Sequence, residues 1–139
     1  TFNTLDKAIR RRLVIENDDH LYDLKDCLEL NRQIGIPIVF DSFHHELLTN
    51  GDSLKLALRK AASTWDKGRD GLPIVDYSSQ YIGNDESSIK RRKGKHAENI
   101  EAVSFKKFLK ETKDLDFDVM LEIKDKEKSA LKALIILNS

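Results

Sequence analysis

Short apolar runs and amphipathic stretches follow one another along the whole chain. The apolar runs predict four buried strands, over residues 13–17, 36–41, 72–76 and 117–122. Between them, apolar residues recur at three- and four-residue spacing, which is typical of amphipathic helices. Because strands and helices alternate, we expect βαβ units and therefore a parallel sheet.

Capping residues predict where the helices begin. Asp18 and Asp19 are candidate N-caps for the helix after the first strand, and Ser53 and Ser104 are candidate N-caps for two later helices. A last helix is expected over residues 125–137. We expect its apolar side to be carried by Leu131, Leu134 and Ile135.

Every predicted strand has an acidic residue at its carboxyl end, in the last position of three strands and in the last position but one of the first. These four residues are Glu16, Asp41, Asp76 and Glu122. In parallel α/β folds, ligands collect at the carboxyl ends of the strands. His44 follows Asp41 by three residues, and carboxylate oxygen and neutral imidazole are both good ligands for divalent transition metals. The pattern predicts a metal site, whereas the competing interpretation is that the acids only cap the following helices.

The composition fits one domain without a dominant charge. The 139 residues suffice for a hydrophobic core, and we expect a single domain over residues 1–139. Lys plus Arg (24) equals Asp plus Glu (24), so no overall field favours nucleic acid or membrane. A lone cysteine, Cys27, and the lack of a long apolar stretch predict a cytoplasmic protein. The non-Met start, Thr1, predicts a fragment of a longer chain.

A long polar segment over residues 77–100 separates the third strand from the next helix. A loop of this length in a compact domain is usually functional or disordered. It holds a basic cluster that is a candidate DNA-binding site, made of Lys90, Arg91, Arg92, Lys93 and Lys95. Contact with a phosphate backbone and simple solvation are equally good interpretations of this cluster.

At these residues the chain resembles the UV damage endonuclease family, metal-dependent DNA repair nucleases built on a (β/α)8 barrel. The matching segments, in chain order, are residues 13–18, 35–45, 76–80 and 117–128. The resemblance implies the C-terminal half of a TIM barrel, with about four βα units and a parallel sheet. A half barrel has two open edges. An open four-stranded α/β sheet is the structural alternative.

The resemblance also implies a divalent metal cluster, with Mn²⁺ first and Zn²⁺, Mg²⁺ or Co²⁺ as alternatives. The implied ligands are Glu16, Asp41, His44, His96 and Glu122, of which all but His96 are also candidate catalytic residues. The family usually has Lys-x-His where this chain has Ile74-Val75-Asp76. Asp76 is therefore a further candidate ligand, through oxygen. His45 is expected to pack or to support the site.

The family's enzymes nick DNA immediately 5′ to UV photoproducts and leave a 3′ hydroxyl. The resemblance thus implies UV-damaged double-stranded DNA as the partner and an intracellular location with DNA. Because the match covers only the C-terminal half of the family's barrel, we expect these 139 residues alone to be inactive.

Two other classes of function compete with this interpretation. Other metal-dependent barrel enzymes, such as apurinic-site endonucleases and sugar isomerases, also place Glu, Asp and His at strand ends. A degenerate, non-catalytic half barrel could bind DNA or form a homodimer through its open edges. The replacement of Lys-x-His by Ile74-Val75-Asp76 favours the non-catalytic alternative, and the five retained candidate ligands oppose it.

Overall fold

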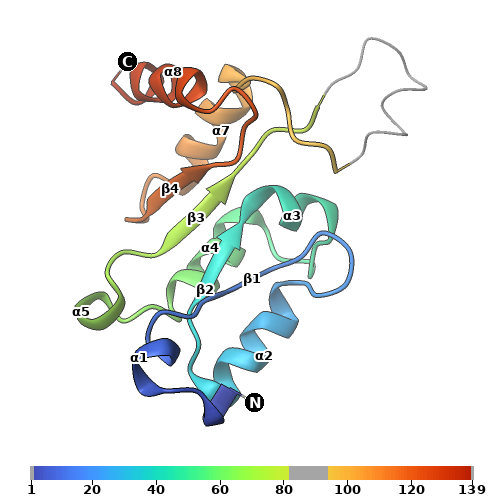
Figure 1. The fold of residues 1–139 in the computed structure, drawn as a ribbon. Helices are drawn as coiled ribbons and strands as arrows, with labels where there is room; N and C mark the ends of the chain where they lie inside the picture. The colour runs from blue at the N-terminus through green and yellow to red at the C-terminus, as the bar shows by residue number, and fades with distance from the viewer. Residues whose placement is uncertain (1, 82–93, 139) are drawn as a thin grey trace.

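A parallel sheet forms the centre of the molecule. The computed structural model describes residues 2–81 and 94–138. Within these ranges the sheet has four strands in chain order, and every neighbouring pair is parallel (Figure 1). The predicted α/β class is confirmed, and four strands are half the number in a (β/α)8 barrel. The strands are β1 (Ile15–Glu16), β2 (Ile38–Asp41), β3 (Ile74–Tyr77) and β4 (Asp118–Leu121).

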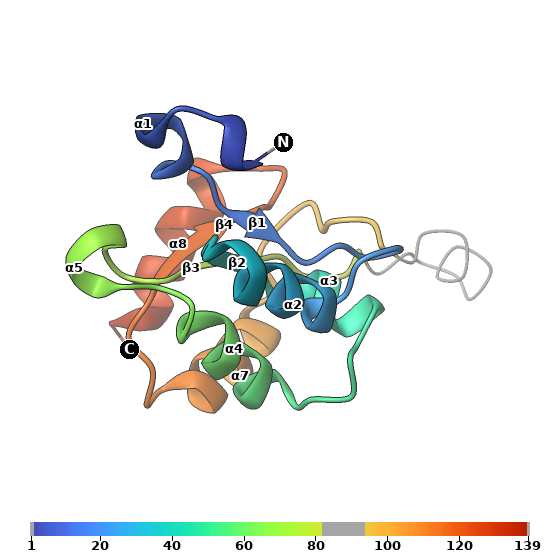
Figure 2. The ribbon, with the colours of Figure 1, turned by 90° about the horizontal axis from the view of Figure 1, so that it is seen from below.

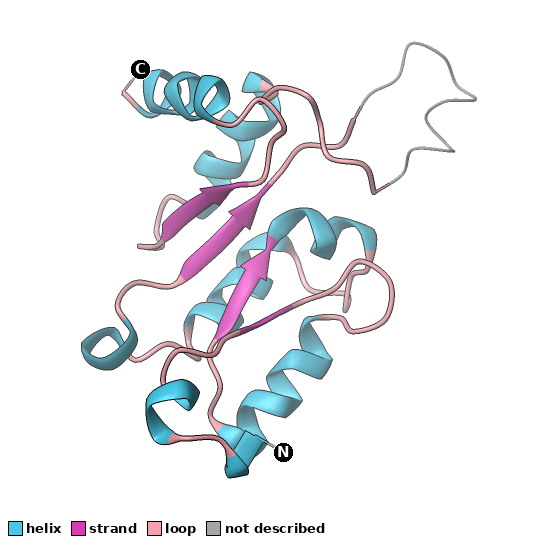
Figure 3. Cartoon of the chain, viewed as in Figure 1, coloured by secondary structure: helices cyan, strands magenta, loops and turns pink. Residues whose placement is uncertain are grey.

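Helices precede, connect and follow the strands (Figure 3). Their bounds are η1 (Phe2–Thr4), α1 (Lys7–Arg10), α2 (Leu24–Ile34), α3 (Ser42–Leu47), α4 (Leu54–Ala62), α5 (Lys67–Asp70), α7 (Ala102–Thr112) and α8 (Glu127–Leu137). Helix α2 contacts α4, α4 contacts α7, and α7 contacts α8. Figure 2 shows α2, α4 and α7 on one side of the sheet, like the outer helices of a barrel.

Side chains alternate between the two faces of this sheet. Ile38, Phe40, Val75 and Tyr77 belong to the core that the helices cover. The residues between them therefore point to the opposite face, because successive side chains of a strand alternate. Asp41 pairs in register with Asp76, so both carboxylates lie on that face.

The beginning of α2 differs from the prediction. Asp23, not Asp18 or Asp19, is its N-cap, and the Asp23 carboxylate accepts from the second and third backbone N–H groups of the helix. Asp18 instead accepts a 2.9 Å hydrogen bond from the Leu21 backbone N–H, which closes a turn before the helix. Short acidic side chains stabilise turns as well as helix ends, so the sequence pattern alone did not show which aspartate caps the helix.

The two later caps had different outcomes. Ser53 caps α4 as predicted, accepting a 3.4 Å hydrogen bond from the Leu56 backbone N–H. Ser104 does not cap α7: its own N–H donates to the Glu101 carboxylate at 2.7 Å. Glu101 is the N-cap of this helix. The helix therefore begins before Ser104, since a longer carboxylate already satisfies its first N–H groups.

The apolar side of α8 is not the side that the protein buries. Leu131, Leu134 and Ile135 are 63%, 55% and 71% exposed, whereas Ser129 and Ala133 are buried. The helix packs on α7. Ser129 also accepts a 2.8 Å hydrogen bond from the backbone N–H of Ile100, which turns the small residues inward. The wider apolar side of the helix is left uncovered.

Most exposed large apolar side chains gather at the two sides where the sheet stops. On the β1 side they are Val14, Leu21, Tyr22 and Leu30. On the β4 side they are Val119, Met120, Leu131, Leu134, Ile135 and Leu137. This is the distribution expected of a half barrel with two open edges. Among the described residues, no helix has the length and apolarity needed to cross a membrane.

Candidate metal centre

Asp41 stands at the junction between β2 and α3. Its side chain is only 1% exposed. One carboxylate oxygen, Oδ1, caps α3 by accepting hydrogen bonds from the backbone N–H groups of Phe43 (2.7 Å) and His44 (2.8 Å). The other oxygen, Oδ2, is buried and accepts no hydrogen bond from any residue in the described ranges. A buried carboxylate oxygen without a donor is a ready cation ligand.

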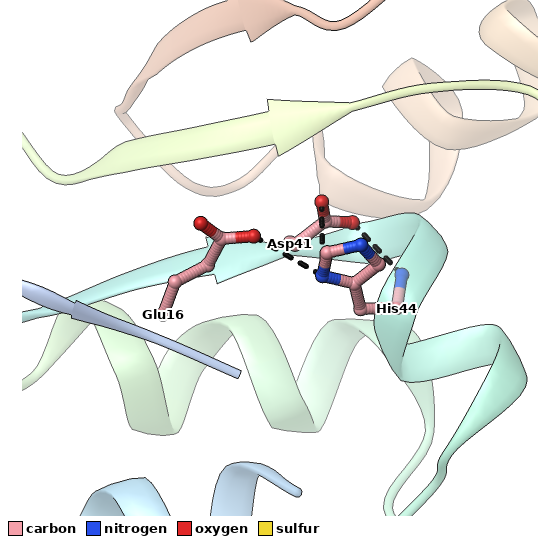
Figure 4. A group of neighbouring side chains, drawn as sticks. All are labelled: Glu16, Asp41 and His44. Atoms are coloured by element: carbon pink, nitrogen blue, oxygen red, sulfur yellow. Dashed lines mark hydrogen bonds and ion pairs between the residues drawn. The ribbon is translucent and has the colours of Figure 1, made fainter. Parts of the chain in front are cut away.

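His44 brings three oxygen atoms to one ring nitrogen. Its Nδ1 lies 2.9 Å from the backbone oxygen of Asn17, 3.1 Å from Glu16 Oε1 and 3.3 Å from Asp41 Oδ2. Figure 4 shows both carboxylates directed at the imidazole, Glu16 from β1 and Asp41 from the end of β2.

Glu16, Asp41 and His44 therefore form a compact donor set. Each offers one ligand atom, and these atoms lie within 4.8 Å of one another. A transition-metal ion with bonds of about 2 Å needs ligand atoms separated by about 3–4 Å. Small side-chain rotations suffice to reach that geometry, so these three residues fit a divalent cation.

Asp76 lies beside this set on the neighbouring strand. The residue is 4% exposed, and its Oδ1 is a second buried oxygen without a hydrogen-bond partner in the described part of the chain. Its backbone oxygen accepts a 3.0 Å hydrogen bond from Ser42 Oγ, which ties β3 to α3. Asp76 is not part of the compact group, although it is the register partner of Asp41.

His96 and Glu122 make a second pair next to the first. His96 Nδ1 lies 2.8 Å from the backbone oxygen of Glu122 and 3.8 Å from its Oε2. The rings of His44 and His96 are 6.4 Å apart between centroids, and Phe43 packs edge-on against His96 at 5.3 Å. The second pair is thus adjacent to the Glu16–Asp41–His44 group but not merged with it.

Negative charge is crowded at this end of the sheet. Burial, together with the carboxylates of Glu16, Glu122 and Asp41, raises the pKa of Asp76 to about 7. Burial likewise raises the pKa values of Glu16 and Asp41. Burial alone would lower the pKa of His44, but the neighbouring Asp41 carboxylate and the Asn17 backbone oxygen raise it overall. A bound cation would relieve this repulsion.

Two predicted residues lie elsewhere or outside the described ranges. His45 is 4% exposed and turns away from the group: its Nε2 lies 3.1 Å from the Asp52 backbone oxygen, and its ring packs on Phe40. This agrees with the packing role expected for it. Lys95 is exposed, with its Nζ 4.8 Å from the centre of the Tyr81 ring. The rest of the basic cluster, residues 90–93, lies outside the described residues.

One residue of the site was not predicted from the sequence. Asn17 follows Glu16 directly and is 1% exposed. Its side-chain amide donates to the Asp41 backbone oxygen at 2.9 Å and accepts from the Asp41 backbone N–H at 3.0 Å. The available signal was a polar amide beside a strand-end acid, but its partner is 24 residues away in the sequence.

Comparison with known proteins adds the family. The model of the UV-endonuclease UvdE family matches residues 1–138. A UV DNA damage endonuclease from Clostridium perfringens is 37% identical over 134 residues, which are 96% of this chain and 31% of that protein. A second one, from Bacillus velezensis, is 34% identical over 133 residues, which are 92% of this chain and 38% of that protein.

The solved structure of SacUVDE superposes with a TM-score of 0.85 at 43% sequence identity. The match covers 99% of this chain and 43% of that one. The chain thus spans roughly a third of the length of these two curated relatives. With a family model matched over nearly all of its residues, the chain belongs to the UV-endonuclease UvdE family.

Proposed function

We propose that this chain provides the metal-binding half of a DNA repair endonuclease that nicks double-stranded DNA immediately 5′ to UV photoproducts. The supporting observation is the convergence of Glu16, Asp41 and His44 at the carboxyl ends of parallel strands. Family membership and the names of the relatives supply the substrate class. By itself, the chain is proposed to be inactive, and the longer protein is proposed to act inside the cell, with DNA.

The donor set indicates which cation fits. Two carboxylates and one imidazole suit Mn²⁺, with Zn²⁺, Mg²⁺ and Co²⁺ as alternatives. Asp76, His96 and Glu122 are proposed to complete a cluster. Bound divalent cations would polarise the scissile phosphate, activate water and stabilise the leaving oxygen.

The residues of the chain have separate tasks in this proposal. The N-terminus of α3 holds Asp41 in one orientation through two backbone N–H groups. The burial of Asp41 and Asp76 excludes water from the carboxylates that face the cluster. Lys95, together with residues 90–93, is proposed to contact the phosphate backbone of DNA.

Metal content tests the site directly. We expect the purified chain to retain Mn²⁺ or Zn²⁺ in stoichiometric amount and the Asp41→Ala, His44→Ala double variant to lose it. Asp116→Ala, His20→Ala is the matched control, because both side chains are 75% exposed. A wild-type chain that binds no divalent cation would contradict the metal site.

A chimera tests the activity. The corresponding segment of the Clostridium perfringens relative would be replaced by this chain, and cleavage of irradiated, abasic and undamaged duplexes would be compared. Incision of the irradiated duplex, abolished by Asp41→Ala, supports the proposal. Preference for the abasic duplex would instead support an apurinic-site endonuclease, and turnover of a sugar would support an isomerase.

A second candidate role follows from the uncovered apolar side chains at both edges of the sheet. The isolated chain is proposed to pair these edges with a second copy, which would give a non-catalytic homodimer. Light scattering of the purified chain decides this: a dimer supports edge pairing, and a monomer at all concentrations contradicts it.

A further inference from the structure

One buried side chain continues the pairing of β1 and β2 beyond the point where their backbones stop pairing. Backbone register ends at Glu16 and Val39. The residue that follows β1, Asn17, then uses both groups of its side-chain amide on the two backbone groups of Asp41, at 2.9 and 3.0 Å. The amide thus makes the pair of hydrogen bonds that a backbone residue would make if β1 continued alongside β2.

The same residue also holds the imidazole of His44. The Asn17 backbone oxygen is the nearest of the three oxygens around Nδ1, at 2.9 Å. A carbonyl oxygen accepts and never donates, so Nδ1 carries the proton and the lone pair of the neutral ring lies on Nε2. His96 has the same arrangement, with its Nδ1 2.8 Å from the backbone oxygen of Glu122.

Through these contacts Asn17 positions three neighbouring residues. Asn17 adjoins Glu16 in the chain, fixes the backbone of Asp41 and binds the ring of His44. Asp41 in turn caps α3, the helix that carries His44. A shift at the end of β2 would therefore move the carboxylate and the imidazole together.

We propose that Asn17 is a positioning residue of the candidate metal centre: its amide fixes Asp41, and its backbone oxygen holds the ring of His44 with Nδ1 toward the carboxylates. The inference rests on the proposed function for its metal. The hydrogen-bonded arrangement itself is measured separately, on the metal-free chain.

The first experiment uses the metal-free chain. Long-range ¹H–¹⁵N correlation spectra distinguish the two imidazole tautomers, and His44→Gln assigns the signal. We expect wild-type His44 to carry its proton on Nδ1 and Asn17→Ala to give a mixture of tautomers. Asn17→Ser, which keeps one hydrogen-bonding group, should lie between them and covers the case in which the alanine variant does not fold.

Asn31→Ala is the matched control. The Asn31 amide also bonds a backbone oxygen, that of Ile36, at 2.8 Å, but outside the metal centre. It should leave the His44 signal unchanged. The proposal is overturned if wild-type His44 is protonated on Nε2, or if Asn17→Ala and Asn17→Ser both retain the wild-type tautomer.

The second experiment adds metal. Diamagnetic Zn²⁺ should shift the ring nitrogen resonances of His44, and Mn²⁺ affinity by electron paramagnetic resonance should fall about 10- to 100-fold in Asn17→Ala, the usual effect of losing a group that orients ligands. Equal losses in Asn17→Ala and Asn31→Ala would overturn the positioning role.

The two proposals fail in different ways. If the wild-type chain binds neither ion, the proposed metal function fails, and the tautomer measurement alone decides the role of Asn17. If the ions bind but the tautomer is insensitive to Asn17, only the positioning role fails.

Discussion

The central strand β2 and the edge strand β4 carry similar acidic residues in different surroundings. All four residues of β2 are buried, and Asp41 at its end is held by Asn17 and α3. Three of the four residues of β4 are exposed, and the Glu122 side chain that follows it is 37% exposed. The comparison teaches that this half barrel fixes its candidate ligands firmly where a strand has neighbours on both sides, and leaves those at the β4 edge more exposed.

The largest expected difference is in stability. Phe40, on β2, is fully buried, so Phe40→Ala should lower the free energy of unfolding by about 3–5 kcal/mol. Met120, on β4, is 51% exposed, and Met120→Ala should change it by less than about 1 kcal/mol. Urea denaturation measures both. Similar losses of stability in the two variants would contradict the difference between β2 and β4, because they would mean that β4 is covered in solution.

Metal binding should show the next largest difference. Asp41→Asn retains an oxygen that can cap α3 but removes the charge, and should weaken Mn²⁺ binding by at least ~100-fold, more than a typical loss of ligand orientation. Glu122→Gln should weaken it by only about 10-fold, because its side chain stands apart from the compact group. Calorimetric titration compares them. A larger loss of Mn²⁺ affinity in Glu122→Gln than in Asp41→Asn would contradict the stronger role assigned to the end of β2.

Substitutions at the start of α7, the helix that precedes β4, should have a smaller effect on stability. Glu101 caps α7, so Glu101→Ala should lower the free energy of unfolding by about 1 kcal/mol, whereas Ser104→Ala should have almost no effect. Thermal unfolding followed by circular dichroism is sensitive enough. If Ser104→Ala proved the more damaging change, the assigned cap would be wrong.

The smallest effect on stability is expected at the open edge itself. Leu131 is 63% exposed on α8, so Leu131→Lys should alter the free energy of unfolding by no more than about 0.5 kcal/mol. The same change should reduce self-association in sedimentation velocity, because it charges the apolar side. Lys132→Leu, beside it, should increase self-association. A marked loss of stability in Leu131→Lys would show that the side is already buried.

The sequence was sufficient to predict the strands, their parallel order and the acidic strand ends. Alternating patterns are local properties, and the carboxyl ends of parallel strands meet by topology. The helix starts were harder, because Asp18 and Asp23 are chemically equivalent caps and only the surrounding turn decides between them. The inner side of α8 depends on what packs against it, which no local pattern contains.

The site was predicted in part for the same reason. The sequence pattern placed Glu16, Asp41 and His44 together, and the structure brings them within ligand distance. It did not separate them from His96 and Glu122, which lie alongside. The role of Asn17 could not be predicted because its amide hydrogen-bonds the backbone of Asp41, 24 residues later. Such a contact produces no repeating pattern in the sequence.

The two carboxylate oxygens of Asp41 have different partners, and this limits the carboxylate to a single bond with an ion. Since Oδ1 is already occupied by two backbone N–H groups, only Oδ2 remains for an ion. Calcium sites draw on bidentate carboxylates and six to eight oxygens, whereas magnesium-sized ions accept single oxygens in an octahedron. A helix cap would thereby act as a filter by ionic size, because the bonds that start α3 disfavour an ion that needs a bidentate carboxylate, such as Ca²⁺, at the end of β2.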